Sequence, residues 1–108
     1  MRAAVMVLAF GLGAAGVAFG QDAKAKGEQV FVAQKCSLCH SIAGKGNAKG
    51  SLDGVGSKLS ADELRNWIVD AKGMTAKTKA TRKPEMKQYS LPKDDVDALV
   101  AYLGSLKK

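Results

Sequence analysis

The stretch Cys36-Ser37-Leu38-Cys39-His40 contains both cysteines and the single histidine of the 108-residue chain. Two residues between the cysteines allow a turn that presents both thiols to one edge of a planar group. The residue that follows then lies below the centre of that group. This Cys-x-x-Cys-His spacing is a signal for covalent haem attachment, with the histidine as the proximal iron ligand. The motif therefore predicts one covalent haem c, held by Cys36, Cys39 and His40.

Two other uses of a Cys-x-x-Cys pair compete with haem attachment. A structural zinc site needs four ligands, and Cys36, Cys39 and His40 already use every cysteine and histidine of the chain. A thioredoxin-like thiol pair follows a strand in an α/β pattern, and no such pattern precedes the motif. Zinc binding and thiol redox chemistry remain as alternatives, and the spacing favours haem.

The sixth ligand of the iron must come from another part of the chain, and a methionine is the obvious candidate because there is no second histidine. Met1 and Met6 lie in the N-terminal segment, which leaves Met74 and Met86. Met74 follows a predicted helix on a short tether, whereas Met86 lies deep in a long loop, so we favour Met86. Thioether ligation would raise the reduction potential. The alternatives are Met74, or an open sixth position as in a haem enzyme or gas sensor.

The first twenty residues have the outline of a secretory signal peptide. Met1-Arg2 gives a basic start, an uncharged segment follows, and Ala18-Phe19-Gly20 supplies a small-x-small end. We therefore expect residues 1–20 to be a leader and residues 21–108 to form the exported, periplasmic domain. The alternative is an uncleaved membrane anchor, because the apolar run is just long enough to span a bilayer.

The size and charge of the chain limit the kinds of partner. Residues 21–108 suffice for one small domain, a size at which a bound cofactor often contributes to stability. The chain has 17 Lys+Arg and 10 Asp+Glu, a formal net charge of +7. Such a surface speeds encounter with acidic partners, and it lacks the interleaved aromatics of a nucleic-acid site. We expect a monomer with redox protein partners, no nucleic acid and no small-molecule substrate.

Helical patterning dominates the mature region and predicts an all-α fold. The first helix is predicted from Asp22 or Ala23 to Lys35, with Gly27 allowing a second helix to approach closely. A capping box of Ser60 and Glu63 starts the middle helix, which is predicted to end near Lys72-Gly73.

The last helix is predicted to begin near Pro92, whose fixed φ suits a first helical turn. Its apolar residues then recur at the spacing of a core-facing helix. Two long segments, residues 41–59 and 74–91, are expected to be irregular. Loops of this length need something to wrap around, and a haem would serve both.

Residues 22–108 resemble the small class I monohaem cytochromes c of bacteria. The attachment motif follows a helix with Gly27 and Phe31, as in that family, and Tyr102 looks like the aromatic partner in the last helix. Lys83-Pro84-Glu85-Met86 resembles the family's methionine loop. The resemblance implies the cytochrome c fold, with three main helices and two long loops wrapped around one covalent haem. It also implies a soluble carrier of single electrons with His40 and Met86 as axial ligands.

Three further residues take possible roles from the resemblance. Trp67 is similar to a middle-helix tryptophan that lies near a haem propionate, and plain core packing is the alternative. The segment around Ser51 and Leu52 is similar to a Gly-Pro-x-Leu segment whose proline carbonyl accepts the ring N–H of the proximal histidine. Ser51 stands where we expect that proline, and its carbonyl would keep the bond to His40 with less rigid placement.

Basic residues gather around the predicted methionine loop, with Glu85 as the one acid among them. Charge runs are usually solvated surface, which is the alternative to a function here. The functional hypothesis is a docking face for an acidic redox partner. Its residues, named here the basic set, are Lys72, Lys77, Lys79, Arg82, Lys83 and Lys87.

Overall fold

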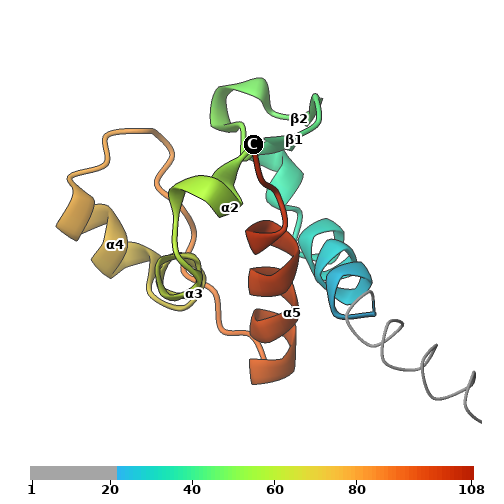
Figure 1. Cartoon of the computed structure of the whole chain (residues 1–108). Helices are drawn as coiled ribbons and strands as arrows, with labels where there is room; N and C mark the ends of the chain where they lie inside the picture. Colours follow the sequence, from blue (N-terminus) through green and yellow to red (C-terminus); the bar gives the residue numbers. More distant parts are fainter. Residues whose placement is uncertain (1–21) are drawn as a thin grey trace, which may run out of the picture.

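The computed structural model describes residues 22–108, and the predicted leader at 1–20 lies outside the described residues. Helices make up most of the described chain, which confirms the all-α prediction (Figure 1). Within residues 22–108, no helix has the length and apolar character needed to cross a membrane. The elements are an N-terminal helix over residues 22–33, then η1 (Cys36–Leu38), β1 (Ser41–Ile42), β2 (Lys45–Gly46), η2 (Ala48–Gly50), α2 (Val55–Lys58), α3 (Ala61–Val69), α4 (Ala71–Thr78) and α5 (Lys93–Gly104).

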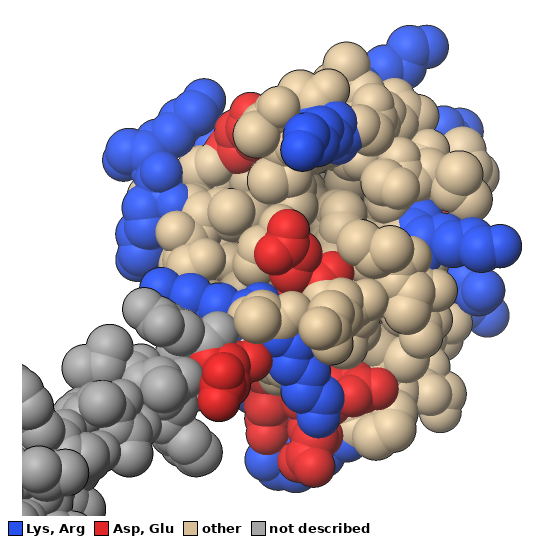
Figure 2. Space-filling view, turned by 90° about the vertical axis from the view of Figure 1, so that its right-hand side faces the viewer, with Lys and Arg blue, Asp and Glu red and all other residues tan. Residues whose placement is uncertain are grey.

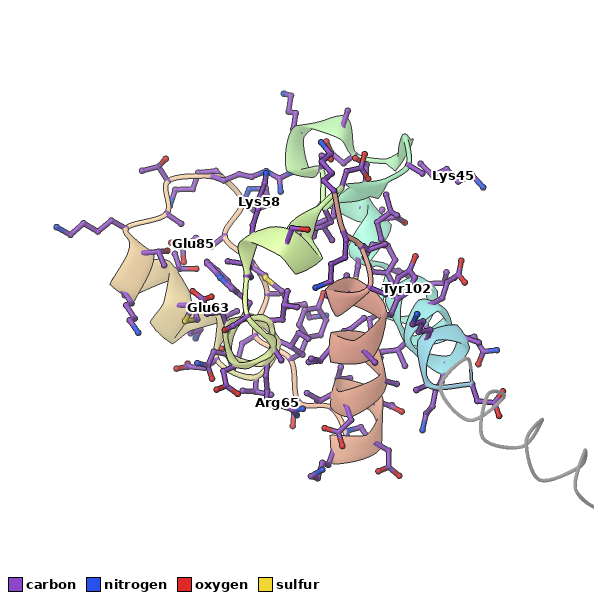
Figure 3. The ribbon with its side chains drawn as sticks, viewed as in Figure 1. Lys45, Lys58, Glu63, Arg65, Glu85 and Tyr102 are labelled. Carbon is purple, nitrogen blue, oxygen red and sulfur yellow. The ribbon has the colours of Figure 1, made fainter. Side chains whose placement is uncertain are left out.

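The N-terminal helix packs against α5 at the predicted glycine. A Cβ atom on Gly27 would collide with the carbonyl oxygen of Ala98 in α5, so only glycine allows this approach. One turn further along, the rings of Phe31 and Tyr102 meet edge to face, with centroids 6.1 Å apart. Figure 3 labels Tyr102, which belongs to α5. Such pairs contribute about 0.5–1.5 kcal/mol beyond their buried area. The predicted aromatic contact is confirmed.

Helix α3 begins at the predicted capping box and packs on α5. The Ser60 Oγ atom accepts from the Glu63 N–H at 3.1 Å, and the Glu63 carboxylate accepts from the Ser60 N–H at 2.9 Å. Buried side chains from four helices then form one core. Its members are Val30, Phe31, Val55, Leu64, Ile68, Val96, Leu99, Val100 and Leu103.

The middle helix does not run to Lys72-Gly73, so that prediction is wrong. Helix α3 stops at Val69, and Asp70 starts the separate helix α4 by accepting from the Gly73 N–H at 3.1 Å. Gly73 therefore lies in a first turn, where a Cβ would collide with the Asp70 carboxylate. The aspartate cap decides the break, because a side-chain oxygen at this position satisfies an otherwise unpaired amide.

Both predicted irregular segments contain regular structure. Residues 41–59 include an antiparallel pair, Ser41 opposite Gly46 and Ile42 opposite Lys45, together with η2 and α2. Residues 71–78 are helical as α4. The long loop that remains covers residues 79–92, includes Met86, and runs from α4 to α5 (Figure 1).

Candidate functional site

A cavity of about 570 Å³ opens between the Cys36–His40 segment, α3 and the 79–92 loop. A smaller pocket of about 80 Å³ adjoins it and reaches the core at Phe31 and Leu99. The two share much of their lining, which is mostly apolar. Residues that line both are Gln34, Cys36, His40, Leu52, Leu59, Trp67, Met86 and Tyr89.

The imidazole of His40 is held by one backbone oxygen. Its Nδ1 atom lies 3.0 Å from the carbonyl oxygen of Gly50. A carbonyl can only accept, so Nδ1 is the donor, and the lone pair of the neutral ring is then on Nε2. Burial lowers the pKa of His40, which outweighs the raising effect of the Gly50 bond; the charge of Arg82 lowers it further. The ring is therefore neutral near neutral pH and free to bind a metal through Nε2.

Both cysteines are free thiols in the wall of the cavity. The turn of η1 places them there, with the amides of Cys39 and His40 both donating to the Cys36 carbonyl at 3.1 and 2.9 Å. Lys35, before this turn, adopts a left-handed conformation with φ 57° and ends the N-terminal helix near residue 33, two residues before the predicted end. Burial raises the pKa of the Cys36 thiol, and Cys39 adds to that effect.

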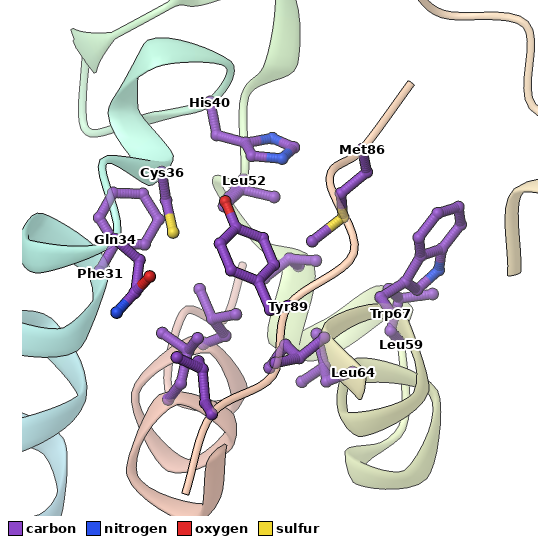
Figure 4. A pocket seen from close by; sticks show the side chains of 15 residues that line it. Phe31, Gln34, Cys36, His40, Leu52, Leu59, Leu64, Trp67, Met86 and Tyr89 are labelled. Carbon is purple, nitrogen blue, oxygen red and sulfur yellow. The ribbon is translucent and has the colours of Figure 1, made fainter. Parts of the chain in front are cut away.

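Met86 lines the cavity and faces the His40 ring across it (Figure 4). It lies on the extended part of the 79–92 loop and is half-buried. Met74, the alternative, is buried in α4 and does not line either pocket. The structure thus brings the favoured methionine, and not its competitor, to the same cavity as His40.

Trp67 and Leu52 also line both pockets, and their contact with a haem stays a prediction. Trp67 is half-buried and is not among the core residues, so its ring contributes to the cavity wall. Tyr89 was missed: its ring projects into the pocket, and burial raises its pKa (Figure 4). Tyr89 is the one aromatic residue of the 79–92 loop and stands three positions after Met86, which was the available signal.

A family model for cytochrome c matches residues 24–107. The chain belongs to the cytochrome c family. Comparisons with curated proteins and with solved structures found no match. Membership of the family makes the protein a haem-based electron carrier in general terms, and it implies covalently bound haem c.

The residues present in this cytochrome fit a haem c. Two free thiols, an imidazole with its lone pair on Nε2 and a thioether all line one cavity. Imidazole and thioether are both axial ligands of haem iron in proteins. The mostly apolar cavity lies within the range of about 300–1,000 Å³ that is usual for ligand and cofactor sites.

In this cytochrome, the residue predicted to accept the hydrogen bond from the His40 ring is wrong by one position. The carbonyl that accepts from His40 belongs to Gly50, whereas Ser51 is exposed and uses its Oγ atom to accept from the Asp53 N–H at 3.2 Å. In a Gly-Pro-x-Leu pattern the carbonyl residue stands two positions before the leucine. Counted from Leu52, that position is Gly50.

All six residues of the basic set are exposed, and they divide into three groups. Lys72 and Lys77 lie on α4, and Lys79 follows it. Arg82 and Lys87 line the larger cavity, while Lys83 pairs with Glu85 at 3.3 Å.

The opposite side of the molecule has a different charge pattern. Figure 2 shows the side with the N-terminal helix, where acidic and basic side chains are intermixed. The 79–92 loop and α4 lie on the other side in Figure 1. Within the basic set, Arg82 and Lys87 line the larger cavity, and the other four residues lie outside its lining.

Proposed function

We propose that this cytochrome is an exported, monomeric carrier of single electrons with one haem c. Cys36 and Cys39 would hold the haem covalently, and His40 and Met86 would be its axial ligands. The observation that carries the proposal is the placement of His40 and Met86, which face one another across a cavity whose wall contains both thiols. When bound, the haem supplies an Fe(III)/Fe(II) couple that takes one electron from a donor and gives it to an acceptor.

Each ligand residue has a defined support in the chain. The Gly50 carbonyl fixes the His40 ring and its tautomer through the 3.0 Å hydrogen bond. Apolar side chains such as Leu52 and Leu59 line the cavity and limit the access of water. If His40 and Met86 both bind the iron, no iron position would remain for a small-molecule substrate.

The basic set supports the proposal of an acidic redox partner. Its members lie on α4 and on the 79–92 loop that carries Met86, and two of them, Arg82 and Lys87, line the larger cavity. A positive surface at this place steers an acidic partner toward the cofactor and speeds encounter at low ionic strength. The expected location is the periplasm, where such a carrier would meet other redox proteins.

Mass spectrometry and visible spectroscopy of the purified protein test the proposal. We expect the mass of one haem added to a chain that starts at Gln21. The ferric protein should show the long-wavelength charge-transfer band of methionine-ligated haem, and Met86→Ala should lose it. Met74→Leu, the matched control, should keep it.

Three outcomes would contradict the proposal. A mass without haem would end it entirely. A band that persists in Met86→Ala would remove the ligand assignment. A high-spin iron that binds carbon monoxide strongly would favour the open-site enzyme or sensor.

A further inference from the structure

The side chain of Gln88 joins the Met86 loop to the break between α3 and α4. Its Nε2 atom donates to the carbonyl oxygen of Val69, the last residue of α3, at 2.6 Å. Its Oε1 atom accepts from the backbone N–H of Lys72, in the first turn of α4, at 3.2 Å. One amide group thus binds both helices two residues after Met86.

These two bonds stand apart from the rest of the loop. Within residues 81–91, as far as the described chain shows, no other group hydrogen-bonds to a different element. The remaining side-chain bond, Lys83 to Glu85, stays inside the loop. Without Gln88, this part of the loop would be held by side-chain packing alone.

The helix break creates the two groups that Gln88 satisfies. Because Asp70 ends α3 and begins α4, the Val69 carbonyl and the Lys72 amide have no partner of the usual helical kind. A continuous helix would have used both groups internally. The break therefore provides an anchor point for the loop.

We propose that Gln88 is a positioning residue for Met86. By bridging α3 and α4 it holds the loop against the cavity and sets how often the sixth position of the iron opens. This inference rests on the proposed ligation by Met86. A foreign ligand can reach the iron only while the methionine is displaced. The inference therefore predicts how tightly such a ligand binds.

Imidazole is a suitable probe, because its apparent affinity scales with the fraction of protein in the open state. Loss of one hydrogen bond of this kind changes the equilibrium constant between bound and displaced methionine by about two- to tenfold. Gln88→Leu removes both bonds and should bind imidazole about tenfold more tightly in the ferric holoprotein. Gln88→Glu keeps the acceptor for Lys72 but loses the donor to Val69, so its affinity should lie between wild type and Gln88→Leu.

Two controls separate positioning from general stability. Gln29→Leu, on the exposed surface of the N-terminal helix, should leave the imidazole affinity unchanged. Ser60→Ala removes the capping hydrogen bond at the start of α3, at the end of that helix away from Val69, and leaves the helix break and the Gln88 side chain unchanged. It should lower the thermal midpoint while the charge-transfer band and the imidazole affinity stay within about twofold of wild type.

The inference is overturned if Gln88→Leu lowers the thermal midpoint but leaves imidazole affinity within twofold of wild type. If Gln88→Leu does not fold, the comparison of Gln88→Glu with wild type decides in the same way. The charge-transfer band of Met86→Ala distinguishes failure of the proposed ligation from failure of the inference about Gln88. A band retained there removes the proposed ligation, whereas a band lost there with unchanged Gln88 variants removes this inference alone.

Discussion

The carbonyl oxygen of Gly50 accepts a hydrogen bond from Nδ1 of His40 at 3.0 Å. A side chain has no room at this glycine, because a Cβ atom would collide with the Cys39 carbonyl and with the guanidinium of Arg82. Gly50 is thus enclosed by the attachment segment on one side and by the methionine loop on the other.

Gly50→Ala should destabilise the folded protein by about 1–3 kcal/mol, since the Cys39 backbone would have to move. Urea unfolding of the holoprotein measures this change. Ser51→Ala, at the exposed neighbour, should change stability by no more than about 0.5 kcal/mol. Equal losses of stability for the two substitutions would show that a Cβ atom at Gly50 does not force the Cys39 backbone to move.

A second prediction concerns the contact of Gly27 with α5. Alanine in a helix interior is normally favoured over glycine by about 1 kcal/mol. Gly27→Ala should nevertheless lower the thermal midpoint, because its Cβ would collide with the Ala98 carbonyl. Gln29→Ala on the exposed face of the same helix is the control and should be neutral. A gain in stability for Gly27→Ala would contradict the packing described here.

A third prediction concerns the pH dependence of stability at Asp97. Hydrogen bonds from Lys93 at 2.7 Å and from Arg65 at 2.8 Å lower the pKa of the Asp97 carboxyl. Because the folded pKa lies below the unfolded value, this stabilisation is present above the ordinary pKa near 3.8 and is lost as pH falls through the folded pKa.

Asp97→Asn should therefore lower the thermal midpoint near neutral pH and have little effect at about pH 2. Thermal unfolding of both proteins across this range is the measurement. Asp62→Asn in α3 controls for loss of an exposed carboxylate. A difference between wild type and Asp97→Asn that persists undiminished at low pH would refute the ion-pair explanation.

A fourth prediction concerns partner docking. Lys72→Gln with Lys77→Gln should slow electron transfer to an acidic partner at low salt, with the difference vanishing at about 0.5 M salt, where charges are screened beyond a few ångströms. Lys24→Gln, on the N-terminal helix, is the matched control and should have a smaller effect. Stopped-flow rates that do not depend on salt would argue against electrostatic docking.

Local signals in the sequence predicted local structure well. The Ser60–Glu63 capping box and the start of α5 after Pro92 depend on residues within one turn of each other. The Phe31–Tyr102 contact came from the resemblance and is confirmed. Met86 lines the same cavity as His40, and its binding to iron stays a prediction.

Features that depend on the backbone or on competing caps were harder to predict. Gly73 fits both a helix end and a first turn, and the Asp70 side chain decides between them. A carbonyl acceptor has no side-chain signature, so the support of His40 was assigned to Ser51 instead of Gly50. The Gln88 bridge depends on a helix break that the sequence did not predict.

The contact between Gly27 and α5 also has a consequence for folding. It joins two positions about seventy residues apart, and both thiols, His40 and Met86 lie on the chain between them. Closing so long a segment costs conformational entropy before any distant contact compensates for it. After the two helices dock, the ends of the intervening segment are already close together. The residues that line the cavity then have fewer conformations to search before they make contact. We therefore expect docking of these two helices to shorten the conformational search of the segment between them.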